Sequence, residues 1–154
     1  PGATEGVNII GVNYPRGVHV DASDNVYVSS QYNHTVYKYT YSGGSYTQTT
    51  VAGGNGNGNA LNQLYNPTGI HVDDSGNVYV ADTENYVIRK ISTSQEVSTF
   101  AGTGNGWGDN DQESTDGDKL ERSLSGPNSV KFDNNGDMFI VEAWAHQISK
   151  VTMS

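Results

Sequence analysis

The 154-residue chain contains no cysteine, only four prolines, and only eight lysine and arginine residues against 17 aspartates and glutamates. The absence of cysteine excludes disulfide bonds, thiolate metal sites and thiol nucleophiles. The net charge of −9 argues against a nucleic-acid partner, because nucleic-acid binding depends on clustered basic residues. No apolar run approaches the roughly 20 residues of a membrane-spanning helix, and no signal peptide is visible. We therefore expect neither a nucleic-acid partner nor a membrane span.

The chain is rich in glycine (19 residues), tyrosine (ten residues) and short runs of valine and isoleucine. Within these runs apolar and polar residues alternate, which indicates half-buried β-strands, and the Gly- and Asn-rich segments between them predict turns. No stretch has the spacing of an amphipathic helix, so we expect an all-β fold with essentially no helix. The length suits a single module spanning residues 1–154. Because the chain opens with Pro1, we expect a processed product or a fragment.

Three segments of the chain align without a gap, and they begin at Pro15, Pro67 and Pro127. An aspartate follows six residues after each proline, and valine or isoleucine recurs in shared columns farther along. Each segment predicts three strands separated by turns, and the first two segments are followed by a fourth strand, at residues 46–52 and 97–101. Repeats of four antiparallel strands at intervals of about 50 to 60 residues are typical of β-propeller blades.

The second segment, PTGIHVDDSGNVYVADTENYVIRKI at residues 67–91, resembles the NHL-repeat family nearly throughout. The resemblance covers about residues 7–152 and implies propeller blades, in a family whose rings usually have about six. The family often pairs an acid after the second strand with an arginine that opens the third strand. Those columns here hold Ser30 and Thr35, Asp82 and Val87, and Glu142 and Gln147. We therefore predict that no blade retains this ion pair.

The repeats divide the module into a lead-in and three blades. The lead-in, residues 7–14, contains an orphan outer strand, and blade 1 covers residues 15–66. Blade 2 covers residues 67–126, and blade 3 covers residues 127–154 and lacks a fourth strand.

Three blades are half of the usual ring and leave two apolar blade faces open to water, which is unfavourable. The orphan strand is suited to complete blade 3 of another copy, so we expect self-assembly into a closed dimer or a fibril. The residues that we expect at this contact are Val7, Ile9, Ile10, Ile148 and Val151. The alternative is that the chain is simply a segment of a longer repeat protein.

An acidic segment is the candidate calcium site, with Asp109, Asp111, Glu113, Asp116 and Asp118 as oxygen donors. It is not an EF-hand, because Ser114 and Leu120 stand where that motif requires glycine and glutamate. The alternative is a solvated acidic loop. No other cofactor is expected.

His19 and His71 occupy equivalent columns on the innermost strands, and Lys131 occupies the third. Their side chains project opposite to the neighbouring valines and isoleucines, so we expect them near the central channel. A family relative, the peptide-amidating lyase, holds zinc with histidines close to its axis, and the resemblance therefore makes His19 and His71 candidate axial ligands. The alternative is a packed, hydrogen-bonded pair. His34 and His146 occupy a structural position of the family.

No Gly-x-Ser-x-Gly motif and no phosphate-binding Gly-Lys-Ser/Thr motif occur, so we predict a structural or interaction module without catalytic activity. The alternative function is a ligand- or metal-binding propeller, with lyase-like activity at the axial histidines. Tyr37, Tyr39 and Tyr41 form a stripe that could bind a protein or a glycan, with blade packing as the alternative. The single N-glycosylation sequon begins at Asn33, and the acidic, cysteine-free surface suits an extracellular setting, with a cytoplasmic one as the alternative.

Overall fold

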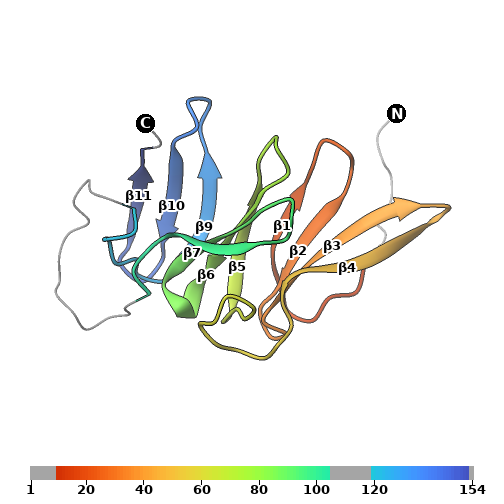
Figure 1. The fold of residues 1–154 in the computed structure, drawn as a ribbon, viewed down its shortest axis with the longest axis horizontal. Helices are drawn as coiled ribbons and strands as arrows, with labels where there is room; N and C mark the ends of the chain where they lie inside the picture. The colour runs from red at the N-terminus through yellow and green to blue at the C-terminus, as the bar shows by residue number, and fades with distance from the viewer. Residues whose placement is uncertain (1–9, 105–118, 153–154) are drawn as a thin grey trace.

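The structure, a computed structural model, describes residues 10–104 and 119–152. These residues form three antiparallel β-sheets that stand side by side, and no α-helix occurs among them (Figure 1). The first two sheets have four strands each, and the third has three in the described part of the chain. The predicted all-β fold of propeller blades is therefore confirmed.

Within each blade the strands pair in sequence order. Blade 1 contains β1 (Pro15–Val20), β2 (Val26–Ser30), β3 (Thr35–Ser42) and β4 (Ser45–Gly53). Blade 2 contains β5 (Pro67–Val72), β6 (Val78–Asp82), β7 (Val87–Ile91) and β8 (Val97–Ala101), with a short 3-10 turn, η1 (Thr83–Asn85), between β6 and β7. Blade 3 contains β9 (Pro127–Phe132), β10 (Met138–Glu142) and β11 (Gln147–Val151). The fourth strands expected from the sequence are found as β4 and β8.

The hairpin that leaves the first strand of each blade is held by the aspartate that follows the proline by six residues. In blade 2, Asp73 Oδ1 accepts hydrogen bonds from the backbone N–H groups of Ser75 (3.0 Å) and Asn77 (2.8 Å). Asp21 and Asp133 accept equivalent bonds in blades 1 and 3. An aspartate stabilises such a turn because its side chain accepts hydrogen bonds from the backbone of the residues that follow. They fix the point at which each inner strand reverses.

The turn before the third strand is left-handed in every blade, although no glycine stands there. His34, Tyr86 and His146 have φ values of 52°, 57° and 55°, a region that residues with a Cβ rarely adopt. Two of these side chains make ring contacts with residues farther along the chain. His34 contacts Tyr65, which lies just before β5, and Tyr86 contacts Trp144 of blade 3, each with 5.5 Å between ring centroids. The ring contacts show how the strained turn is held in blades 1 and 2.

Two apolar cores fill the joints between neighbouring blades. The core between blades 1 and 2 is formed by Tyr27, Val36, Ala52, Leu64, Ile70, Val72, Val78, Val80 and Ile91. The core between blades 2 and 3 is formed by Tyr79, Ala81, Ile88, Phe100, Ala101, Leu124, Val130, Met138, Ile140 and Val151. Blade 2 therefore contributes residues of alternate strand positions to both joints, which requires both of its faces to be apolar.

Close approach of the inner strands accounts for two glycines. A Cβ on Gly17 would lie 2.3 Å from the Thr68 carbonyl oxygen, and one on Gly69 would lie 2.6 Å from Ser129 Cα. Real side chains do not tolerate such distances to backbone atoms, so glycine lets β1 pack against β5 and β5 pack against β9. In blade 3 the same column holds Ser129.

The prediction that no blade keeps the acid–arginine pair is wrong for blade 2. Arg89 Nε donates to Asp82 Oδ2 at 3.1 Å, and both side chains are buried. The prediction looked for the arginine only at Val87, the residue that opens β7. Because side chains alternate along a strand, Arg89 lies on the same face as Val87 and reaches back to the acid.

Blade 3 keeps the ion pair through a residue from outside the blade. The buried carboxylate of Glu142 accepts hydrogen bonds from the Arg122 guanidinium, the Ser149 hydroxyl and, at 2.8 Å, the Ser125 backbone N–H. Arg122 lies in the connection that precedes β9. Only blade 1 departs from the pattern, since its column holds Ser30, whose hydroxyl donates to the Asn13 carbonyl oxygen at 2.6 Å.

Candidate functional site

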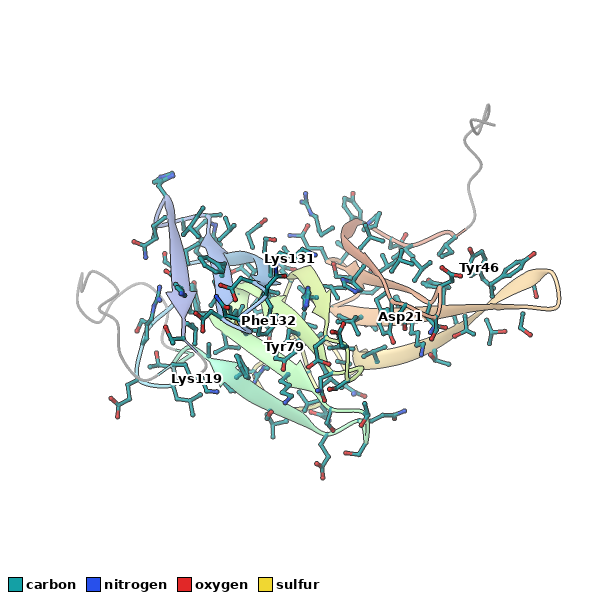
Figure 2. All side chains as sticks on the ribbon, turned by 90° about the horizontal axis from the view of Figure 1, so that it is seen from above. Asp21, Tyr46, Tyr79, Lys119, Lys131 and Phe132 are labelled. Atoms are coloured by element: carbon teal, nitrogen blue, oxygen red, sulfur yellow. The ribbon has the colours of Figure 1, made fainter. Side chains whose placement is uncertain are left out.

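The inner strands bring the two candidate axial histidines together. The rings of His19 on β1 and His71 on β5 meet edge to face, with 5.2 Å between centroids. His71 also contacts Phe132 on β9 at 5.1 Å, and Phe132 contacts Tyr79 at 4.7 Å. Figure 2 shows Phe132 and Tyr79 close together, with Lys131 beside them. His71 therefore connects the inner histidine pair to the aromatic part of the core between blades 2 and 3, and Lys131 is the cationic side chain near both histidines.

This environment disfavours a proton on either imidazole. Burial, together with the nearby His19 and Lys131, lowers the pKa of His71 to about 4, and the charges of Asp73 and Asp74 only partly oppose this shift. Burial and Lys131 likewise lower the pKa of His19. Both rings are therefore neutral at pH 7 and retain lone pairs. The buried Nδ1 of His71 has no hydrogen-bond partner in the described part of the chain.

The metal site that the resemblance implies is not assembled by these residues alone. Among residues 10–104 and 119–152, no three His, Asp or Glu side chains come together in a way that could hold a metal ion. The third inner-strand position is Lys131, whose ammonium group repels a cation. Asp21 and Asp73 lie nearby, but their oxygens accept the hydrogen bonds of the turns.

The structure also presents two large apolar faces at the two end blades. On blade 1, Val18 and Val20 are 64% and 55% exposed. A groove of about 700 Å³ runs along this face, and its lining includes Ile10, Val12 and Val28. The groove lies between β1, β2 and the segment that leads into β1. We call this surface the blade-1 face.

The opposite surface is the blade-3 face, formed by the outward side chains of β10 and β11. Phe139 and Val141 are 37% and 39% exposed, and Ile148 is 71% exposed. Of the predicted contact residues, Ile10 and Ile148 lie on the two faces. Val151 is different, because its side chain packs in the core between blades 2 and 3. Only its backbone, on the edge strand β11, is available to a partner.

The sequence analysis missed most of the residues on these two faces. It named no residue of β1 or β10 as exposed, because their alternating pattern matches that of buried strands. These residues could have been identified by comparing aligned positions of the repeats. Val18 aligns with Ile70, and Val141 aligns with Ala81; both partners are buried only because blade 2 has a neighbour on each side.

The tyrosine stripe lies on a long hairpin. β3 and β4 extend beyond the length of the other outer strands, as Figure 1 shows. Tyr39 is buried, whereas Tyr41 is exposed and contacts the tilted ring of Tyr46 with 5.1 Å between centroids. Figure 2 places Tyr46 at the far end of this hairpin. The stripe therefore divides into a packed part and an exposed tip.

The remaining predicted sites have separate locations. Asn33 lies in the turn between β2 and β3, and its side-chain amide donates to the Tyr37 hydroxyl at 3.3 Å. The proposed calcium donors, Asp109 to Asp118, lie outside the described residues, as do Val7 and Ile9. No helix capable of crossing a membrane is found in the part of the chain that the structure describes.

Comparison with known proteins identifies the repeat. Residues 64–91 match the model of the NHL repeat, which confirms the resemblance seen in the sequence. No curated protein sequence matches the chain.

Several solved propeller structures share the fold. A protein of unknown function from Bacteroides thetaiotaomicron is 30% identical, with a TM-score of 0.66 over 82% of this chain and 32% of that one. An auxiliary nutrient binding protein from Bacteroides ovatus is 18% identical, with a TM-score of 0.71 over 88% and 36%. A virginiamycin B lyase from Staphylococcus aureus is 14% identical, with a TM-score of 0.59 over 90% and 38%. The chain thus spans about a third of the length of these structures.

Proposed function

We propose that this chain, which carries an NHL repeat and folds as three β-propeller blades, is a non-catalytic interaction module that assembles with further copies of itself. The observation that carries the proposal is the contrast between equivalent positions. Ile70 is 3% exposed in the joint between blades 1 and 2, whereas Val18, in the same column, is 64% exposed. A second copy would cover the blade-1 and blade-3 faces as the internal joints cover blade 2. Burial of such faces contributes roughly 25 cal/mol per Å² of apolar area.

Strand donation is the second part of the proposal. In the described residues β11 is the outermost strand of the blade-3 sheet. The orphan strand at residues 7–11 would pair with this edge in another copy and would protect it from uncontrolled pairing. Such a head-to-tail contact either closes into a ring of two chains or continues as a fibril.

The similar proteins support a role in binding. One carries the description of an auxiliary nutrient binding protein, and the sequence contains no Gly-x-Ser-x-Gly motif that would mark a nucleophile. For the cellular setting we propose an extracellular one, in which Asn33 carries a glycan. Intact mass of native material from a eukaryotic source tests this: an unmodified Asn33 peptide would contradict it.

The mass of the native assembly tests the main proposal. We expect light scattering to give a dimer or larger species for the full chain. Deleting residues 1–12 removes the donated strand together with part of the groove, and should shift the protein to monomer or to non-specific aggregate. Circular dichroism shows whether the truncated chain keeps its sheets. A full-length chain that stays monomeric at high concentration, or a truncated chain that keeps the original assembly, would contradict self-assembly or strand donation respectively.

A second candidate function, ligand binding at the inner strands, is favoured by the contact between His19 and His71 beside Phe132 and Lys131. Two neutral imidazoles and an ammonium group suit a ligand with both hydroxyl and carboxylate groups. A related proposal is calcium at Asp109 to Asp118. Titration calorimetry with zinc and with calcium separates these ideas from the first, and a lower melting temperature in EDTA would support the calcium site.

A further inference from the structure

The two internal joints of the molecule are built in the same way. In each, an apolar residue of the third strand is fully buried, namely Val36 in blade 1 and Ile88 in blade 2. Each lies in one core with the leucine that precedes the next blade's proline by three residues: Val36 with Leu64, and Ile88 with Leu124. The third-strand residue therefore acts as a knob, and the leucine, in the connection that leads into the following blade, forms part of the hole that receives it.

Further residues of the hole also correspond between the joints. Ile70 and Val80 stand in the first core where Val130 and Ile140 stand in the second. These pairs occupy identical columns of the repeat. The hole is thus a property of the repeat and not of one blade.

The blade-1 face contains the same hole without a knob. Val12 precedes Pro15 by three residues and so occupies the leucine column, while Val18 and Val28 occupy the columns of Ile70 and Val80. All three valines line the groove of about 700 Å³. The groove is therefore the position that a third-strand residue of a preceding blade would fill.

The blade-3 face contains the matching knob without a hole. Ile148 occupies the column of Val36 and Ile88 and is 71% exposed. The adjacent Lys150 ammonium lies 5.7 Å from the centre of the Phe139 ring, and Lys90 lies at the same distance from Tyr79 on the covered face of blade 2. The blade-3 face thus has the construction of a face that another blade covers.

We infer that the contact between copies repeats the register of the internal joints, with Ile148 of one copy seated between Val12, Val18 and Val28 of the next. This inference rests on the proposed self-assembly and names the face and the register that it uses. In the same register Phe139 would meet Val20, as Tyr27 shares a core with Val72. The partner is therefore a second copy of this chain, bound head to tail.

One position makes this joint different from the internal ones. Gly17 and Gly69 stand where a Cβ would lie 2.3 Å and 2.6 Å from the backbone of the next blade. In the joint between copies the same column is Ser129, whose Cβ would meet the backbone around Gly17 of the next copy. The inner strands must therefore stand farther apart there, by about 1 Å, to restore ordinary contact. The joint between copies is wider at the inner strands than either internal joint.

Cysteine substitution tests the register, because the chain has no cysteine of its own. We would mix equal amounts of Val12→Cys and Ile148→Cys proteins and treat them with a short bis-maleimide, since cysteine replaces an apolar residue with little change. Cross-linking of most of the protein to a covalent pair is expected. Thr93→Cys, on an exposed turn of blade 2, replaces Val12→Cys in the control mixture, which should give at least tenfold less product.

The outcomes separate this inference from the proposed function. A monomeric full-length chain contradicts self-assembly itself. An intact assembly of native mass in which the Val12→Cys and Ile148→Cys mixture cross-links no better than the control would overturn the register while leaving self-assembly in place. Ser129→Gly provides an independent readout: removing the Cβ should tighten self-association about tenfold, and an unchanged or weaker association would overturn the proposed approach of the inner strands.

Discussion

Blade 2 and blade 1 share a sequence pattern but not an environment. Ile70 and Val72 on β5 are buried beneath blade 1, whereas Val18 and Val20 on β1, in the same columns, are exposed. Both strands alternate apolar and polar residues, and both form the same hairpin. The comparison shows that burial in this fold is decided by the neighbouring blade. An alternating strand therefore indicates a surface that needs a partner and does not identify that partner.

The two blades also differ in the polar interaction made by the last residue of the second strand, Asp82 in blade 2 and Ser30 in blade 1. Asp82 of blade 2 accepts hydrogen bonds from Arg89, from Asn85 at 2.8 Å and from the Tyr65 backbone N–H at 2.7 Å. Burial raises the pKa of Asp82, and these bonds oppose that rise. Blade 1 has Ser30 in the same column and no buried charge there. Blade 2 therefore depends on an ion pair that blade 1 lacks.

The largest effect is expected from Arg89→Ala. The substitution leaves Asp82 buried without its cationic partner, and breaking such a pair destabilises a fold by about 3–5 kcal/mol. Urea denaturation gives the free energy of unfolding. The double variant Asp82→Ser with Arg89→Tyr reproduces the blade-1 residues and should be more stable than Arg89→Ala. A single variant within about 1 kcal/mol of the native chain would show that the ion pair contributes little.

Truncating equivalent apolar residues should sharpen the contrast between the blades. Ile70→Ala creates a cavity in the core between blades 1 and 2 and should cost about 2–5 kcal/mol. Val18→Ala removes an exposed side chain and should change the stability of an isolated copy by less than about 0.5 kcal/mol. Melting at several protein concentrations tests both. Equal losses at low concentration would mean that Val18 is covered within one chain.

A smaller loss is expected at the close approach of the inner strands. Gly69→Ala places a methyl group against the backbone of Asn128 and Ser129, and such overpacking typically costs about 1–3 kcal/mol. Gly11→Ala is the matched control at protein concentrations at which the chain is monomeric, because nothing in the same chain lies within 4 Å of a Cβ at that position. If both variants melted together with the native chain, the inner strands would have to be more adaptable than their spacing indicates.

The smallest effect concerns pH. The pKa of His71 is lowered to about 4 in the folded chain, so the unfolded chain binds more protons between about pH 6.5 and 4. Stability should therefore fall as the pH falls through this window. His71→Phe keeps an aromatic ring but cannot titrate, and its melting temperature should fall by about 2–4 °C less than that of the native chain. Parallel curves for the two proteins would show that His71 does not contribute.

The sequence was sufficient to predict the blades but not their contacts. The prolines at 15, 67 and 127 and the alternating columns predicted β1 to β11 with small differences at the ends. The Asp82–Arg89 pair was missed because only the first residue of the third strand was compared, although alternation brings the third residue back to the same face. The alignment of Val12 with Leu64 had no evident meaning until the structure showed a groove beside it.

The histidine cluster shows the same limit. The shared column of His19 and His71 predicted neighbouring inner-strand positions, and the rings do meet. The column could not predict the contact between His71 and Phe132, because Phe132 stands one position beyond Lys131, and valine occupies its column in the other two blades. The lowered pKa values of His19 and His71 depend on such contacts, so they could be assigned only from the three-dimensional structure.

The left-handed turns at His34, Tyr86 and His146 bear on how the three blades arose. Each turn adopts a backbone conformation that glycine would adopt more readily, yet none of the three blades uses glycine there. If the blades had arisen independently, the same unfavourable turn conformation would have had to arise three times. Duplication of one ancestral blade would instead copy the conformation into every blade. The blades differ in their charges and in the lengths of their outer strands, whereas the backbone conformation of this turn is the same in all three.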